Sequence, residues 1–253
     1  MKIFVTSPHY DDIGRVFNLL NVNYSPYQNR LDCDILFLNC GTSDVVPEKE
    51  LRLFVQNGGI LYASDLTSTF VSTVFPNIFN FEGNIGLSGE IDAFVCDAEL
   101  KTIIGEKVKI NFDMSSWSVL NSVKQGKVIL QSIQGKPIMV QVPYGKGAIF
   151  YTCFHNHAQA TEKETIILRL LILKQVSEYK KTSLEKVSEE LNVNLSDYKK
   201  EFFGDFLTSE NTQKEKAKEN NIVKNSQEDV WGRFQNPKNN QNNQANEDIW
   251  DKL

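Results

Sequence analysis

Two of the chain's three histidines, His155 and His157, directly follow an unbroken apolar stretch at residues 148–154. Such a stretch is typical of a strand that is buried on both faces. Open α/β sheets place their ligand sites where strands end in polar, titratable residues. An imidazole in that place could act as a base for a nucleophile or as a metal ligand.

Other polar residues follow predicted strands that would end at the same edge of the sheet. Carboxyl ends of parallel strands lie side by side, so their terminal residues can converge on one pocket. The residues expected to gather there with His155 and His157 are His9, Asp11, Asp12, Cys40, Ser64, Asp65 and Asn156. We therefore predict a ligand pocket at this edge, whether or not it catalyses a reaction.

Two chemistries are open to these residues. Ser64 could act as a nucleophile with His155 as its base, oriented by Asp65, Asn156 or His157, in a hydrolase of unknown substrate. The glycines that normally permit a strained nucleophile turn are absent around Ser64. The two histidines with Asp65 could instead bind a metal ion, but an H-x-H pair is weak evidence. We expect neither a metal nor a cofactor, and the simplest interpretation of His155 is a hydrogen-bonded residue at a strand end.

Strands and helices alternate through the first 75 residues. The predicted strands are 2–6, 22–24, 35–38 and 60–63, and the predicted helices begin at Asp11 or Asp12, at Pro47 and at Thr67. Short connections between such elements predict a parallel sheet covered by helices on both faces. In the segment 79–143 this alternation stops and only strands are predicted, which indicates a β-rich insertion or an antiparallel extension at one sheet edge. Its predicted strands are 93–96, 108–112, 128–133 and 138–142.

Helices and then a polar tail follow the last strand. Capping boxes at 161–164 and 182–185 predict two helix starts, the first opening a largely apolar helix from 166 to about 179. Residues 176–207 are predicted to form a small helical appendage. From 208 to 253, Lys, Glu, Asn and Gln dominate, so the segment cannot bury enough apolar surface to offset its ordering entropy. We predict that this tail is disordered.

The tail contains one pattern twice, at residues 228–234 and 247–253. Each copy reads acid, acid, β-branched, Trp, variable, basic, apolar. A tryptophan in a polar tail has no core to fill, so a groove on a protein partner is a natural destination. The predicted partner-binding residues are Trp231, Phe234, Trp250 and Leu253.

Composition excludes several other classes of function. The formal net charge is −5, with both signs spread along the chain and no basic stripe, which argues against nucleic-acid binding. No apolar run approaches the roughly 18 residues of a membrane span, and the first residues lack a secretory signal pattern. We therefore expect a cytoplasmic protein. Its four scattered cysteines form neither a zinc signature nor a disulfide framework.

Three stretches, 34–41, 54–65 and 145–155, give the chain a family resemblance. Over residues 1–175 it resembles the class I glutamine amidotransferase-like superfamily, which includes ThuA-like proteins. The resemblance implies a flavodoxin-like α/β fold, with the β-rich segment 79–143 inserted. In the family's enzymes, a cysteine in a G-x-C-x-G pattern follows the strand that 60–63 would supply. A histidine in an F-H-P-E pattern follows a later strand.

This chain departs from the family pattern at the catalytic positions. Phe154-His155 matches the histidine position, but Asn156 and His157 replace the proline and the glutamate. After the strand at 60–63, where the family's enzymes carry the cysteine, this chain has Ser64 and Asp65. Cys40 ends a different strand, so we do not expect Cys40 to replace the missing nucleophile. The resemblance therefore implies a non-catalytic, amidotransferase-like binding or scaffold protein that recruits a partner through its tail. The alternative is the hydrolase using Ser64 and His155.

Overall fold

The computed structural model describes residues 1–19, 22–159, 162–190 and 193–202. Both tail motifs, at 228–234 and 247–253, lie outside the described residues, as does Thr161 of the first predicted capping box. Among the described helices, none has the length and apolar character needed to cross a membrane.

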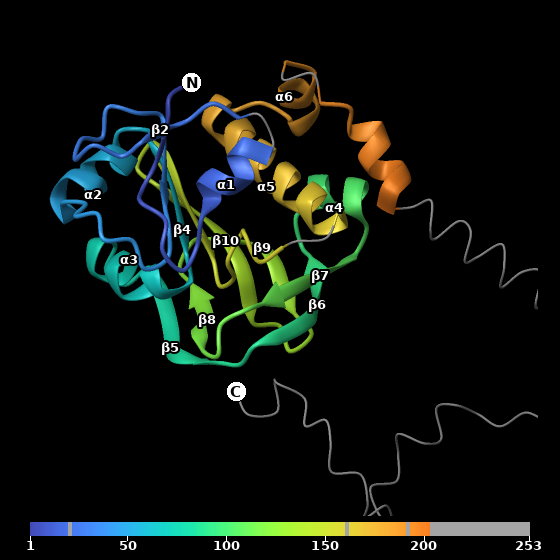
Figure 1. Cartoon of the computed structure of the whole chain (residues 1–253), viewed down its shortest axis with the longest axis horizontal. Coiled ribbons are helices and arrows are strands. Elements are labelled where there is room, and N and C mark those ends of the chain that lie inside the picture. The colour runs from blue at the N-terminus through green and yellow to red at the C-terminus, as the bar shows by residue number, and fades with distance from the viewer. Residues whose placement is uncertain (20–21, 160–161, 191–192, 203–253) are drawn as a thin grey trace, which may run out of the picture.

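In the part of the chain that the structure describes, nine strands form one mixed sheet in the order β2-β1-β3-β4-β11-β10-β9-β6-β7 (Figure 1). The first five of these are parallel, and the last four continue the sheet in antiparallel pairs. The parallel strands are β1 (Ile3–Val5), β2 (Ser25–Pro26), β3 (Ile35–Leu38), β4 (Ile60–Ser64) and β11 (Gly147–Thr152). Their order matches the flavodoxin-like 2-1-3-4-5 arrangement, which confirms the predicted fold class.

Helices cover both faces of the parallel half (Figure 1). On one side lie α2 (Glu48–Gln56) and α3 (Ser68–Val74), and on the other lie α1 (Ile13–Leu19) and α5 (Glu162–Lys180). Helix α2 follows Pro47, carries acidic residues in its first turn as predicted, and buries Leu51 and Val55. Strands β3, β4 and most of β11 are buried along their whole length, because helices pack on both of their faces.

The second strand lies later than predicted. The sequence indicates a strand at 22–24, but the observed strand is Ser25–Pro26, which pairs with Phe4 and Val5 of β1. The amide of Val22 instead donates to the carbonyl of Phe17 at the end of α1, and Tyr24 packs against the Phe17 ring. A proline is tolerated here because β2 is an edge strand.

The β-rich segment contains more elements than the sequence predicted. Strands β6 (Gly89–Val95), β7 (Lys107–Phe112), β9 (Lys127–Ser132) and β10 (Pro137–Tyr144) belong to the main sheet, while β5 (Phe79–Gly86) and β8 (Trp117–Val123) form a separate two-stranded sheet. The short helix α4 (Ala98–Ile104) was not predicted. Its N-cap is Asp97, whose side chain accepts a hydrogen bond from the amide of Leu100.

The helices after β11 pack on the domain. Lys174 on α5 is almost fully buried and pairs with Asp97, Glu99 and Glu178, which ties α5 to α4. Helix α6 (Leu184–Glu190) is preceded by Ser183, whose hydroxyl accepts from the amide of Lys186 as a cap. The cap predicted at Thr182 is therefore displaced by one residue. Residues 195–202 form one more helical stretch.

Candidate functional site

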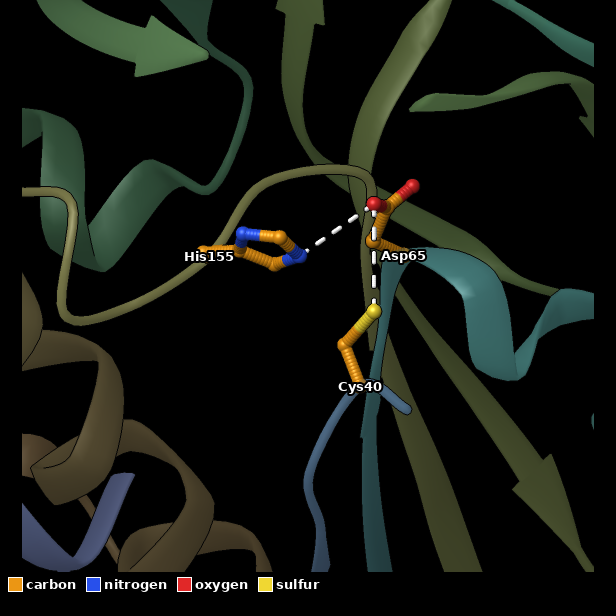
Figure 2. Close-up of side chains that lie close together, drawn as sticks. All are labelled: Cys40, Asp65 and His155. Carbon is orange, nitrogen blue, oxygen red and sulfur yellow. Dashed lines mark hydrogen bonds and ion pairs between the residues drawn. The ribbon is translucent and has the colours of Figure 1, made fainter. Parts of the chain in front are cut away.

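Three neighbouring parallel strands bring a thiol, a carboxylate and an imidazole together at their carboxyl ends (Figure 2). Cys40 follows β3, Asp65 follows β4 and His155 follows β11. The Asp65 Oδ2 atom lies 3.9 Å from Cys40 Sγ and 3.2 Å from His155 Nε2. Strand pairing fixes this convergence, because β4 is hydrogen-bonded to β3 on one side and to β11 on the other.

Asp65, rather than Ser64, occupies the elbow after β4. Its backbone φ is +43°, in the left-handed region that non-glycine residues rarely adopt. The turn is held because Asp65 Oδ1 accepts a hydrogen bond of 2.7 Å from the amide of Ser118, and the Asp65 carbonyl accepts one from the Tyr151 hydroxyl. Backbone strain of this kind persists only where surrounding structure over-determines it.

Each ring nitrogen of His155 faces a carboxylate. Nδ1 lies 2.9 Å from Asp113 Oδ1, and Nε2 points toward Asp65 and Cys40 (Figure 2). The buried Nε2 atom has no hydrogen-bond partner among the described residues, although Asp65 Oδ2 is only 3.2 Å away. Burial alone would lower the pKa of His155, but Asp65, Cys40 and the charge of Asp11 outweigh it and raise the pKa to about 11.

A second polar cluster surrounds Asp11, which is fully buried. One of its oxygens accepts from Ser64 Oγ at 2.9 Å and from Asn156 Nδ2 at 2.7 Å, and the other from the Asn156 amide at 3.0 Å. His157 Nδ1 lies 3.1 Å from the Asp11 carboxylate. Burial acts to raise the pKa of Asp11, but His157, His155 and the bonds from Asn156 outweigh it and lower the pKa.

The structure thus separates the predicted pocket residues into groups. Cys40, Asp65 and His155 form one cluster, and Asp11, Ser64, Asn156 and His157 form the other. His9 is exposed, with its ring edge against Tyr10, and Asp12 accepts from the amide of Arg15 at the start of α1. Within the described residues, Ser64 Oγ is hydrogen-bonded to Asp11 and not to His155.

Residues 113–118, which connect β7 to β8 and include the first two residues of β8, close the edge over His155. From this segment, Asp113 contacts the histidine ring and Ser118 contacts the elbow carboxylate. Trp117 anchors this segment by stacking on Phe112 at 4.1 Å and by donating from Nε1 to the Leu87 carbonyl. As a result, Cys40 is 0% exposed and Asp65 and His155 are each 1% exposed.

Burial also determines the state of the thiol. It raises the pKa of Cys40 above the ordinary thiol value, an effect that the neighbouring histidine opposes only in part. The thiolate is the nucleophilic form of cysteine, and a buried, protonated thiol is inert. The cluster therefore has the residue types of a nucleophile, a base and an orienting acid, but all three side chains are buried.

Sequence reasoning missed several members of the two clusters. Asp113 follows the predicted strand 108–112, and Ser118 lies between predicted strands of the β-rich segment, which the sequence indicates only as an insertion or an antiparallel extension at one sheet edge. Nothing in that pattern indicates that they reach the parallel strand ends. Tyr62 lies inside the buried strand β4, where its hydroxyl donates to Asn156 Oδ1 at 2.6 Å and lies 3.0 Å from Thr152 Oγ1. A tyrosine within an otherwise apolar strand was the one available signal for a buried polar partner.

Comparison with known proteins gives similarity of fold. No protein-family model and no curated protein matches the sequence. Among solved structures, a ThuA-like protein from Bacteroides uniformis aligns with a TM-score of 0.52 and 11% identity, over 73% of this chain and 94% of that one. A glutamine amidotransferase from Thermotoga maritima aligns with a TM-score of 0.42 and 10% identity, over 79% and 93%. A protein described as a GMP synthase subunit, from Thermoplasma acidophilum, aligns with a TM-score of 0.47 and 16% identity, over 67% of this chain and 90% of that one.

At 11% identity, the ThuA-like structure establishes the shared architecture and nothing about activity. The chain therefore shares its fold with this ThuA-like protein, and its function has to be argued from its own side chains.

Proposed function

We propose that the protein is a non-catalytic, amidotransferase-like binding or scaffold module that recruits a protein partner through its tail. The observation that carries the proposal is the burial of the Asp65–His155 pair at the position where the resemblance implies a cysteine–histidine pair. Catalysis at such a centre requires a nucleophile that a substrate can reach.

Several features of the core support a structural role for this centre. Asp65 contacts His155 and Ser118, His155 contacts Asp113, and each of these contacts joins segments far apart in the sequence. Buried polar groups that are paired in this way specify one arrangement of a core. The clusters therefore hold the carboxyl edge of the sheet, where an enzyme of this fold would bind its substrate, in one arrangement.

The repeated tail pattern supports the recruitment part of the proposal. Trp231 with Phe234 and Trp250 with Leu253 are the apolar anchors of the two copies. Aromatic anchors carry a large share of the binding free energy at many interfaces. Two linked copies raise apparent affinity, because binding of the first increases the effective concentration of the second.

A pull-down with the immobilised full-length chain, followed by mass spectrometry, tests recruitment. Replacing both Trp231 and Trp250 with alanine should reduce capture of the partner far more than either replacement alone, by about 10²-fold or more if both copies bind at once. A matched variant with Asn239→Ala and Asn240→Ala changes the same tail outside the motifs and should capture normally. Equal capture by the double tryptophan variant and the wild type would reject recruitment through these motifs.

The alternative function is a hydrolase of unknown substrate that uses Ser64 and His155. The hydrogen bond from Ser64 Oγ to Asp11 argues against it, because the hydroxyl has to donate to the base before it can attack. Ser64→Ala separates the two functions in cells. The scaffold proposal expects this variant to retain function while deletion of residues 225–253 abolishes it, and the hydrolase expects the opposite pattern.

A further inference from the structure

We propose that Cys40, Asp65 and His155 form a binding site for a single Zn²⁺ ion that ties together the ends of β3, β4 and β11. Their ligand atoms, Sγ, one carboxylate oxygen and one ring nitrogen, all lie within 4.8 Å of one another (Figure 2). This set differs from the histidine pair that the sequence suggested, because His157 contacts Asp11 rather than this cluster. The inference does not depend on the tail motifs.

The spacing of the ligand atoms is close to that of a tetrahedral zinc centre. Zinc–nitrogen and zinc–oxygen distances of about 2.0–2.2 Å and a zinc–sulfur distance of about 2.3 Å place neighbouring ligand atoms about 3.3–3.6 Å apart. The observed separations are 3.2 Å between Asp65 Oδ2 and His155 Nε2 and 3.9 Å between Oδ2 and Cys40 Sγ. The third pair, Cys40 Sγ and His155 Nε2, lies within 4.8 Å, so rotation of the side chains toward one another would complete the geometry.

The orientation of His155 is the second, independent observation. Its Nε2 atom is buried and aimed at the cluster, where it faces Asp65 Oδ2 at 3.2 Å as an ion pair without hydrogen-bond geometry. A buried ion pair is costly unless its polar atoms are fully satisfied, and a metal ion between the two groups would satisfy both. The other ring nitrogen, Nδ1, lies 2.9 Å from Asp113 Oδ1. Histidines that ligate zinc through one nitrogen typically donate from the other to such a carboxylate, which fixes the tautomer.

The charges of the cluster also suit a divalent ion. Zinc binding would require the Cys40 thiol to lose its proton and His155 to lose the proton on Nε2, while Nδ1 keeps its proton toward Asp113. The two protons go to solvent. The ion, the thiolate and the Asp65 carboxylate then sum to zero charge, which lowers the cost of burying each of them.

The described residues provide three ligands, so a water molecule would take the fourth position. Three protein ligands and a water resemble a catalytic zinc centre, but side-chain exposures of 1% or less at all three positions restrict this one to a structural role. The ion would replace the buried Asp65–His155 ion pair with bonds that join three adjacent strands. Because zinc would bind the folded state, it should raise the stability of the chain.

Metal analysis of the purified full-length chain tests the site directly. The chain is stripped with a chelator, incubated with Zn²⁺ and desalted, and its zinc content is then measured by mass spectrometry. We expect about one zinc per wild-type chain and at least about a tenfold lower content in Cys40→Ser. Cys153→Ser is the matched control, since Cys153 is equally buried but donates to the carbonyl of Pro137 instead. Retention of zinc by Cys40→Ser, or a folded wild type that takes up none, would overturn the proposal.

Two further measurements keep the test decisive if Cys40→Ser does not fold. Co²⁺ added to the stripped wild type should produce a thiolate-to-metal absorption band, which Mg²⁺ cannot produce, and its absence would contradict cysteine ligation. Asp113→Asn, which changes a positioning residue outside the ligand set, should weaken Zn²⁺ affinity about 10–100-fold. Unchanged affinity in that variant would contradict the proposed role of His155.

Discussion

The hydroxyl of Ser64 donates a hydrogen bond to Asp11 Oδ2 across 2.9 Å, and both side chains are fully buried. Asp11 precedes α1 and Ser64 ends β4, so the bond joins the first helix to the centre of the sheet. Asp11 also receives hydrogen bonds from Asn156, which follows β11. The carboxylate is therefore the centre of a cluster in which Ser64 is one of several donors.

Replacing the two partners should have unequal effects on stability. Ser64→Ala removes one hydrogen bond and leaves Asp11 its other donors, so the free energy of unfolding should fall by about 1 kcal/mol. Asp11→Ala leaves several buried donors without an acceptor and should cost about 3–5 kcal/mol. Urea unfolding followed by circular dichroism measures both. Equal losses in the two variants would show that Asp11 is not the shared acceptor.

Part of this arrangement could be predicted from the sequence. The apolar runs at 35–38 and 60–63 are the strands β3 and β4, and the polar residues after them lie at one sheet edge because parallel strands end side by side. That geometric rule placed Cys40, Asp65 and His155 in one region. It could not say which would touch, since contact depends on side-chain direction and on the backbone turn at Asp65.

The residues that close the site were beyond sequence reasoning. Asp113 and Ser118 reach the parallel strand ends because β8 leaves the main sheet and pairs with β5. Nothing in the local pattern of 117–123 distinguishes that pairing from membership in the main sheet. At the elbow, Ser64 is the residue type expected for a nucleophile, whereas the left-handed backbone belongs to Asp65.

Gly147 should be among the least replaceable residues of the chain. An added Cβ there would overlap the backbone oxygens of Gly59 and Val55, which cannot move without displacing α2 and β4. We expect Gly147→Ala to lower the free energy of unfolding by about 3 kcal/mol or more. Gly135→Ala is the control, since its Cβ meets open space and only its φ of +81° resists substitution, at about 1–2 kcal/mol. Similar losses in the two variants would contradict close packing at Gly147.

Tyr62→Phe tests the polar contacts inside β4. The hydroxyl donates to Asn156 Oδ1 at 2.6 Å in a fully buried setting, so its removal leaves that acceptor without its partner. The expected loss in the free energy of unfolding is about 1–3 kcal/mol. Tyr24→Phe removes a hydroxyl whose contact with Asn18 is long and exposed, and it should cost less than about 0.5 kcal/mol. Thermal or urea unfolding of the two variants measures these losses. A larger loss for Tyr24→Phe than for Tyr62→Phe would contradict the prediction.

The network around Asp97 should make stability depend on acid pH. Burial acts to raise the pKa of Asp97, but Lys127, the amide of Leu100 and Lys174 outweigh it and lower the pKa. A carboxyl group whose pKa is lowered by folding stabilises the protein above its unfolded value of about 3.9, and this contribution is lost as pH falls through the folded value. Wild-type stability should therefore fall with decreasing pH below about 4 through this group.

Asp97→Asn isolates that contribution, because an asparagine oxygen can still accept from the Leu100 amide and cap α4. What is lost is the charge facing Lys127 at 2.5 Å and Lys174 at 3.6 Å.

Near pH 7 the variant should be about 1–3 kcal/mol less stable than the wild type, since Lys127 is half exposed and Lys174 keeps Glu99 and Glu178. The difference in stability should shrink toward zero in strong acid, where the protonated wild-type carboxyl is as uncharged as the asparagine amide. Asp92→Asn, an exposed change on the preceding strand β6, should track the wild type throughout. Urea unfolding at a series of pH values measures these differences. If the difference in stability between Asp97→Asn and the wild type stayed constant across pH, the charge of Asp97 would contribute nothing to folding.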